Sequence, residues 1–159
     1  MSRSPGVTRR RLLALAALAP AWPGLARAAE VTLPVAADLP AQLQAALRHH
    51  DPLVVLVSLP GCPFCKAVRE SHLAPAVREQ GLPVVQVDMM SRQALRDFRG
   101  EASTHERLIE AWRIRVAPTV LFFGPRGDEV AKRLVGSYLP DFYGSYLEQR
   151  LESARKSLA

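Results

Sequence analysis

The sequence has 159 residues, a 48% share of hydrophobic residues and a formal net charge of +6. This length and composition fit one globular domain with a hydrophobic core and leave too little chain for two such domains. The positive charge alone does not indicate a nucleic-acid partner, because that argument depends on where the charges lie.

The N-terminal segment has the three-part order of a secretory signal peptide. A basic cluster (9–11) precedes an apolar run (12–22) and an A-x-A-like cleavage site (26–28). The apolar run is too short to span a bilayer comfortably. We therefore expect residues 1–28 to be cleaved, residues 29–159 to form one domain, and the protein to be periplasmic. The arginine run also resembles a twin-arginine signal, but ordinary signals contain such runs too, so both export routes stay open.

The predicted signal peptide carries most of the excess positive charge. Five of the 21 basic residues and none of the 15 acidic residues precede residue 29. The remaining chain has 16 basic and 15 acidic residues, which is a net charge of +1. This near balance removes the argument for a nucleic-acid partner.

The folded part begins with a helix, a strand and a second helix. Helical spacing of apolar residues over 38–50, with Asp38 as the N-cap, predicts the first helix. The run LVVLVSL (53–59) is apolar and does not alternate, which predicts a central strand buried on both faces. Helical spacing then returns over 66–80, and Pro75 is expected to kink or split that helix.

The middle of the chain reads as a strand and two helices. PVVQVD (83–88) predicts the strand, and SRQALRDF (91–98) predicts a short helix. Ser103 and Glu106 have the spacing of a capping box, which predicts the start of a further helix that ends near Arg113.

Two strands and a helix complete the chain. TVLFF (119–123) and EVAKRLVG (129–136) flank GPRGD, in which Pro125 and Gly127 suit a type I turn, so we expect an antiparallel hairpin. Apolar residues at every third or fourth position of 143–158 predict an amphipathic helix. Since helices connect the early strands and a hairpin joins the late ones, we expect an α/β fold with a mixed central sheet flanked by helices.

Cys62 and Cys65 are the only cysteines, and they lie in LPGCPFCKA directly after the predicted buried strand. The N-terminus of a helix stabilises a thiolate, which is the attacking species in disulfide exchange. A second thiol one turn later resolves the mixed disulfide, while Pro63 fixes the backbone between the two. The spacing therefore favours a redox couple that needs no cofactor other than its own disulfide.

Other interpretations of the cysteine pair have less support. A disulfide staple would close a very small loop, which adds little stability. Haem attachment needs a histidine after the second cysteine, where this chain has Lys66. A structural zinc site needs four ligands, and the histidines show no ligand-like spacing. We expect Met89 and Met90 to fill the core rather than bind copper. A module that uses the two thiols as soft metal ligands stays open as an alternative.

Three motifs together resemble the thioredoxin superfamily. They are LPGCPFCKA after a buried strand, Val-Ala-Pro-Thr (116–119) before the hairpin, and Val-Gly (135–136) at the end of the last strand. The resemblance covers about residues 38–156 and implies a thioredoxin-like fold. It also implies that Pro118 follows a cis peptide bond and faces the cysteines, and that Ala117 binds the substrate through its backbone.

The resemblance assigns roles to the cysteine loop. It implies that Cys62 attacks a partner disulfide and that Cys65 resolves the mixed disulfide. Gly61, Pro63 and Phe64 are expected to contact the substrate, and Phe64 is expected to be exposed because a large apolar residue between active cysteines suits partner contact.

The sequence departs from the family pattern at three places. Leu56 occupies the position of the buried acid that serves as a proton relay, so water or another group would have to serve. Gly61 and the Pro63-Phe64 pair differ from the thioredoxin motif and are closer to that of glutaredoxins. The segment 88–118, which precedes the cis-proline strand, is also about twice as long as in small thioredoxins.

The resemblance implies an exported oxidoreductase that acts on thiols and disulfides of partner proteins. The chain is similar to periplasmic thioredoxins that keep partner thiols reduced, including the type associated with sulfur-oxidation systems. No histidine lies between the cysteines, which favours a reductant over a strong oxidant. We expect a monomer that receives electrons from a membrane or periplasmic protein, because no nucleotide or flavin motif is present. A disulfide-donating oxidase or isomerase of the same fold stays open as an alternative.

Overall fold

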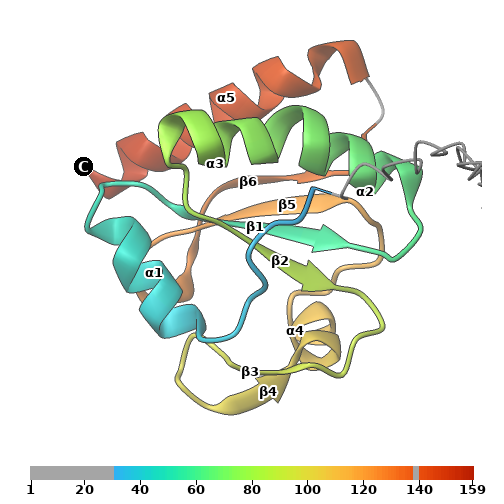
Figure 1. Cartoon of the computed structure of the whole chain (residues 1–159). Coiled ribbons are helices and arrows are strands. Elements are labelled where there is room, and N and C mark those ends of the chain that lie inside the picture. The colour runs from blue at the N-terminus through green and yellow to red at the C-terminus, as the bar shows by residue number, and fades with distance from the viewer. Residues whose placement is uncertain (1–30, 138–139) are drawn as a thin grey trace, which may run out of the picture.

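The computed structural model describes residues 31–137 and 140–159, and the prediction of a signal peptide (1–28) lies outside them. The described chain forms a four-stranded sheet of order β2-β1-β5-β6, with helices on both faces, and a second sheet made of β3 and β4 (Figure 1). The helices and strands in chain order are α1 (Leu39–Leu47), β1 (Leu53–Ser58), α2 (Pro63–Val68), a π-helical turn (Arg69–Leu73), α3 (Ala74–Gln80), β2 (Val84–Asp88), β3 (Ala94–Arg96), β4 (Ala102–Thr104), α4 (His105–Ala111), β5 (Thr119–Phe123), β6 (Glu129–Val135) and α5 (Tyr143–Leu158), with short 3-10 turns at Pro125–Gly127 and Pro140–Phe142.

The strand that leads to the cysteines lies inside the central sheet, as its apolar run predicted. β1 pairs in parallel with β2 and antiparallel with β5, and β5 pairs antiparallel with β6. Every residue of β1 is buried. The mixed sheet is therefore confirmed. The segment before α1, which the sequence did not predict as part of the sheet, bridges the outer edge of β2 through Val35 and Gln86.

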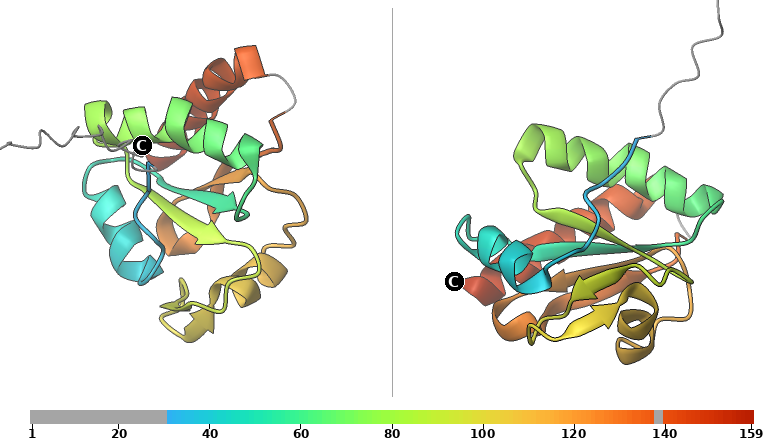
Figure 2. Two further views of the ribbon diagram at one scale, coloured as in Figure 1. Left: turned by 45° about the vertical axis from the view of Figure 1, so that its right-hand side comes forward. Right: turned by 60° about the horizontal axis from the view of Figure 1, so that its bottom comes forward.

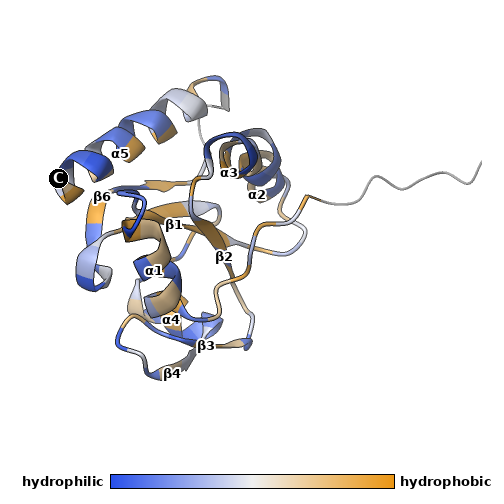
Figure 3. Cartoon of the chain, turned by 60° about the vertical axis from the view of Figure 1, so that its left-hand side comes forward, coloured by the Kyte–Doolittle hydropathy of each residue, from blue (hydrophilic) through white to orange (hydrophobic). Residues whose placement is uncertain are grey.

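Alternate residues of the strands feed two hydrophobic clusters, one on each face of the sheet. Val54, Leu56 and Phe122 pack on the face that α2, α3 and α5 cover. Val55 and Val57 pack on the opposite face, beneath α1, α4 and the small sheet. The right-hand view of Figure 2 shows this layering. Figure 3 shows hydrophobic residues concentrated in the central strands and hydrophilic residues along the outer turns of α5.

The helix that follows the cysteines is interrupted where a proline was expected to disturb it. Pro75 has no N–H to donate to the preceding turn, and the chain forms the π-helical turn Arg69–Leu73 immediately before α3. Gly81 then ends the helix in the left-handed conformation, with φ 68°. The Asp38 N-cap is also confirmed, because its side chain accepts a hydrogen bond from the N–H of Ala41 at 3.0 Å.

The prediction of a helix over 91–98 was wrong. Residues Ala94–Arg96 form β3, which pairs antiparallel with Ala102–Thr104 of β4. The side chain of Asp97 accepts hydrogen bonds from the N–H groups of Arg99 and Glu101, both at 2.9 Å, and so stabilises a tight turn between the strands. This local turn chemistry prevails over a weak helical spacing.

The capping box at Ser103 was also wrong. Ser103 is paired with Leu95 in the small sheet, so α4 begins one residue later. Thr104 is the N-cap, and its Oγ1 accepts a hydrogen bond from the N–H of Arg107 at 3.3 Å.

The hairpin of β5 and β6 is confirmed, but its turn is not type I. Arg126 has φ 63° and ψ 6°, which is the conformation of position i+2 in a type II turn. The N–H of Gly127 closes the turn on the carbonyl of Gly124 at 3.0 Å. The terminal helix buries Tyr143 and Leu147 among its apolar positions, as predicted. Within the described residues, no helix is long and apolar enough to cross a membrane.

Candidate active site

The two cysteines lie where β1 passes into α2. Cys62 is the N-cap of α2, and its Sγ accepts a hydrogen bond from the N–H of Cys65 at 3.2 Å. Both cysteines are free thiols; Cys62 is half-buried and Cys65 is buried. The more accessible thiol therefore lies at the helix N-terminus, where backbone N–H groups favour a negative sulfur.

The loop before the helix sets this geometry. Gly61 has φ 73°, a left-handed conformation that a glycine adopts without penalty. The N–H of Cys62 bonds to the carbonyl of Leu59 at 3.2 Å, and Pro63 occupies the first turn of α2, where its missing N–H costs nothing. Pro63 and Phe64 are both exposed beside the thiol.

The environment of Cys65 favours the protonated form of its thiol. Burial, followed by the hydrogen bond and the charge of Cys62, raises the pKa of its thiol from 9.0 to about 11. Hydrogen bonds from the backbone of Leu59 and the side chain of Ser58 act in the opposite direction and lower this pKa. At neutral pH, Cys65 is therefore a thiol, whereas an attacking group must be a thiolate.

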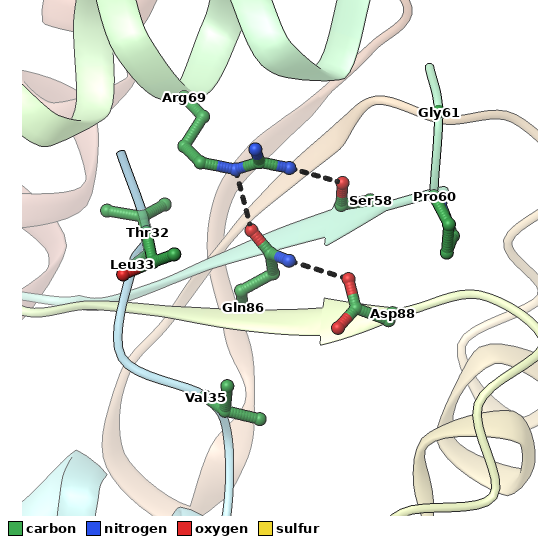
Figure 4. Close-up of a pocket in the computed structure, with 9 residues that line it drawn as sticks. All are labelled: Thr32, Leu33, Val35, Ser58, Pro60, Gly61, Arg69, Gln86 and Asp88. Carbon is green, nitrogen blue, oxygen red and sulfur yellow. Dashed lines mark hydrogen bonds between the residues drawn. The ribbon is translucent and has the colours of Figure 1, made fainter. Parts of the chain in front are cut away.

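A chain of polar side chains lies beside the cysteine loop (Figure 4). Arg69 donates from Nη2 to Oγ of Ser58 at 3.1 Å and from Nε to Oε1 of Gln86 at 3.0 Å. Gln86 in turn donates from Nε2 to Oδ1 of Asp88 at 2.6 Å. These four side chains line a cavity of about 410 Å³, which Gly61 and Pro60 of the cysteine loop also border. None of the four was predicted from the sequence as a site residue.

Leu56 is fully buried in the apolar cluster beneath α2 and α5. Ser58 follows two positions later and therefore points to the same face of β1. A polar residue at the end of an unbroken apolar strand was the signal that would have drawn attention to Ser58.

The bond between Ala117 and Pro118 is cis, as the resemblance implied. Thr119, the residue after Pro118, pairs with Val57 near the end of β1, so Pro118 lies at the edge of the sheet from which the cysteine loop departs. Thr119 Oγ1 donates to the carbonyl of Val116 at 2.7 Å, and the N–H of Gly136 donates to the carbonyl of Pro118 at 2.7 Å. These bonds hold the loop from both sides.

Three apolar side chains stay exposed on the segments that leave this edge. Phe64 is 60% exposed, as expected, while Met90 is 84% exposed and Val116 is 40% exposed. The prediction that Met90 fills the core was wrong: its backbone has φ 64°, which turns the chain at the end of β2 and leaves the side chain outside. Met89 packs against the core beneath the small sheet, as predicted.

No group of three or more cysteine, histidine or acidic side chains gathers as a possible metal site within 31–137 and 140–159. His105 is buried between backbone groups instead. Its Nδ1 accepts from the N–H of Asp88 at 3.0 Å, and its Nε2 lies 3.2 Å from the carbonyl oxygen of Ala36.

Comparisons with known proteins show which family the chain belongs to. A family model described as a thioredoxin-like domain matches residues 39–151. Among solved structures, a thioredoxin from Nicotiana alata is 15% identical, with a TM-score of 0.48 and coverage of 76% of this chain and 97% of that one. The periplasmic thioredoxin SoxS from Paracoccus pantotrophus, in its reduced form, is 20% identical, with a TM-score of 0.42 and coverage of 64% and 96%. A search of curated proteins found no match.

Proposed function

The chain belongs to the family of thioredoxin-like domains, and from this premise we propose that it is an exported thiol-disulfide oxidoreductase that reduces disulfides in partner proteins. The observation that carries the proposal is the unequal pair of thiols. Cys62 is accessible at a helix N-terminus, and Cys65 lies buried one turn behind it. This arrangement separates an attacking thiol from a resolving thiol.

The reaction proceeds in two exchanges. The Cys62 thiolate attacks one sulfur of the partner disulfide, forms a mixed disulfide and releases the other sulfur as a thiolate. Cys65 then attacks Sγ of Cys62, so that the Cys62–Cys65 bond forms and the second partner sulfur leaves. The two protons of the dithiol end on the two partner sulfurs, and two electrons pass to the partner.

The exposed surface around Cys62 supports a protein partner. Phe64, Met90 and Val116 offer apolar contact area, and the backbone of Ala117 beside Pro118 is the expected place for an extended partner segment. The signal-peptide pattern supports export to the periplasm, where a membrane or periplasmic protein would return electrons to a monomeric enzyme.

Cysteine variants test this cycle. Cys62→Ser is expected to abolish reduction of a protein disulfide, and Cys65→Ser is expected to accumulate a mixed disulfide through Cys62, visible as a covalent adduct that a small thiol removes. The reduction potential, measured against dithiothreitol ratios, is expected near or below about −230 mV.

Three results would contradict the proposal. Full activity of Cys62→Ser would remove the attacking role of this thiol. A potential near about −120 mV would make the protein a disulfide donor, and thiols that never form an intramolecular disulfide would favour the soft metal site instead.

A further inference from the structure

Ser58 is a buried hydroxyl, only 1% exposed, at the last position of β1. Its Oγ accepts a hydrogen bond from Nη2 of Arg69 at 3.1 Å. Its side chain points to the face of β1 that α2 covers, where Cys65 is buried, and it lowers the pKa of the Cys65 thiol. A serine oxygen accepts with its lone pairs and donates its single proton. Since Arg69 donates to the oxygen, the proton of Ser58 is available to the sulfur, and the guanidinium polarises that O–H bond.

Arg69 is well placed to hold this orientation. Its side chain is only 8% exposed and is fixed through Nε to Gln86, which is itself tied to Asp88 at 2.6 Å. The backbone N–H of Asp88 is bonded to His105. Figure 4 shows the guanidinium reaching from the π-helical turn after α2 to Ser58 at the end of β1 and to Gln86 in the middle of β2. The donor to Ser58 is therefore positioned by bonds from two strands.

Three other groups interact with Cys65, and their roles differ from that of Ser58. Cys62 raises the pKa of Cys65 by its charge and its hydrogen bond, and the backbone of Leu59 lowers it. Tyr143 reaches the same region from α5, and its buried hydroxyl has no hydrogen-bond partner among the described residues. Among the described residues, none of the groups that act on Cys65 is a carboxylate. Leu56, at the position of the buried acid of the family, is apolar.

We propose that Ser58 is a catalytic residue of the resolution step, in which it donates a hydrogen bond to the Cys65 thiolate, and that Arg69 is the positioning residue that aims it. This proposal rests on the reductase function proposed above. In the resolution step, the Cys65 thiol gives its proton to water and its sulfur attacks Sγ of Cys62. The Cys62–Cys65 bond forms, the bond from Cys62 to the partner sulfur breaks, and the partner sulfur leaves with the electron pair and takes a proton from water. Ser58 keeps its own proton throughout.

The size of the effect follows from thiol chemistry. A hydrogen bond to a charged group stabilises it by about one to two pKa units. Losing one unit lowers the thiolate fraction about tenfold but raises the reactivity of the remaining thiolate about threefold. The net effect is therefore a resolution step that is roughly three- to tenfold slower when the hydroxyl is removed.

The experiment follows both exchanges with a coloured aromatic disulfide, which releases one thiol when Cys62 attacks and a second when Cys65 resolves. The first phase depends on reagent concentration, and the second does not. Ser58→Ala is expected to slow the second phase roughly three- to tenfold from about pH 6 to about pH 9, and to move the rise of its pH profile to higher pH. Its first phase should stay unchanged. Arg69→Met should slow the second phase in the same direction, and Arg69→Lys should slow it less.

Two comparisons separate chemistry from packing. Ser157→Ala removes a hydroxyl that bonds only to the carbonyls of Val130 and Ser153, so it should change neither phase. Ser58→Thr and Ser58→Val are equal in size, and only the threonine keeps the hydroxyl, so they repeat the test if Ser58→Ala does not fold. An unchanged second phase in Ser58→Ala, or equal slowing by threonine and valine, would overturn the proposal. If the wild-type protein itself shows no second phase, the reductase function fails instead.

Discussion

At the scale of single residues, the two thiols are made unequal by position, and the proposed reaction would change that inequality. The charge and the hydrogen bond of Cys62 are two of the causes that raise the pKa of Cys65. Both causes disappear when Cys62 is bonded to a partner sulfur, because it then carries no charge. Formation of the mixed disulfide therefore lowers the pKa of the resolving thiol at the moment when its thiolate is needed.

The buried thiol also makes the stability of the reduced protein depend on pH. The folded state holds the Cys65 proton up to a pKa of about 11, whereas the ordinary value is 9.0. The contribution is thus fully present below about pH 9 and is lost as the pH rises to about 11, because the unfolded chain releases its proton first. We expect the free energy of unfolding to fall by about 2 to 3 kcal/mol across this window.

Urea unfolding of the reduced protein at increasing pH measures this loss. Burial also raises the pKa of Tyr143, so part of the alkaline loss belongs to that residue. Cys65→Ala isolates the thiol, because it keeps Tyr143 and should lose correspondingly less stability over the same range. Identical pH dependence in the two proteins would contradict the assignment.

The residues that the sequence could predict are those with local signals. Cys62, Cys65 and Phe64 lie in one short motif, and Pro118 was implied by resemblance. Ser58 had a local signal as a polar residue at the end of an apolar strand, but its pairing with Arg69 had none, because the two are 11 positions apart and meet only in the folded protein. Met90 was misjudged because its placement depends on a positive φ, which a sequence of ordinary residues does not reveal.

At the scale of elements, long regular patterns were predicted correctly and short ones were not. The central strands and α5 have apolar patterns that extend over several residues, so burial determines their structure. The segment over 91–98 has only a weak pattern, and its three-residue strand alternates exposed, buried and exposed around Leu95. That alternation is too short to outweigh helical spacing in a sequence, but pairing with β4 stabilises it in the fold.

The small sheet is anchored to the central sheet through Phe98. Its ring lies 4.7 Å from that of Phe123 and 6.3 Å from that of Trp112, centroid to centroid. A Cβ added at Gly127 would lie 2.4 Å from Cγ of Phe98, and Gly127 has φ 77°. The turn between β5 and β6 therefore needs glycine for its backbone conformation and for the space that Phe98 occupies.

We expect Gly127→Ala to lower the free energy of unfolding by about 2 to 5 kcal/mol, the sum of a left-handed alanine and an overpacked contact. Gly100→Ala is the matched control. Gly100 has φ 81°, but the nearest atom to its added Cβ is the end of the flexible Arg96 side chain at 3.1 Å, so a loss of about 1 to 2 kcal/mol is expected. Equal losses of unfolding free energy in the two variants, measured by chemical denaturation, would show that the Phe98 side chain moves aside without an energetic penalty.

At the scale of the whole molecule, the topology brings the site together at one edge of the sheet. β1 and β2 are parallel and end at this edge, and β5 begins there because it runs antiparallel to β1. The cysteine loop follows β1, Met90 follows β2, and the cis-proline loop precedes β5. Figure 1 shows β1 and β2 ending on the side of the molecule where α2 begins.

This arrangement predicts that a protein substrate and a small disulfide will respond differently to surface changes. Phe64 lies between the two cysteines and Met90 follows β2 at the same edge of the sheet. Neither takes part in the proposed sulfur exchange, so we expect both to act through contact with the partner. Exposed apolar side chains that become buried on binding contribute about 1 to 2 kcal/mol each. Phe64→Ser and Met90→Ser should each lower kcat/KM for a protein disulfide about 5- to 30-fold and leave the rate with the aromatic disulfide within about twofold.

Tyr146→Ser provides the control, since Tyr146 is an exposed aromatic residue on α5 and belongs to neither the cysteine loop nor the cis-proline loop. It should change neither rate. Equal losses on both substrates for Phe64→Ser would mean that Phe64 shapes the thiol environment rather than the docking surface. Unchanged rates on both would place the partner contact elsewhere, and Val116 beside the cis-proline loop would then be the next residue to replace.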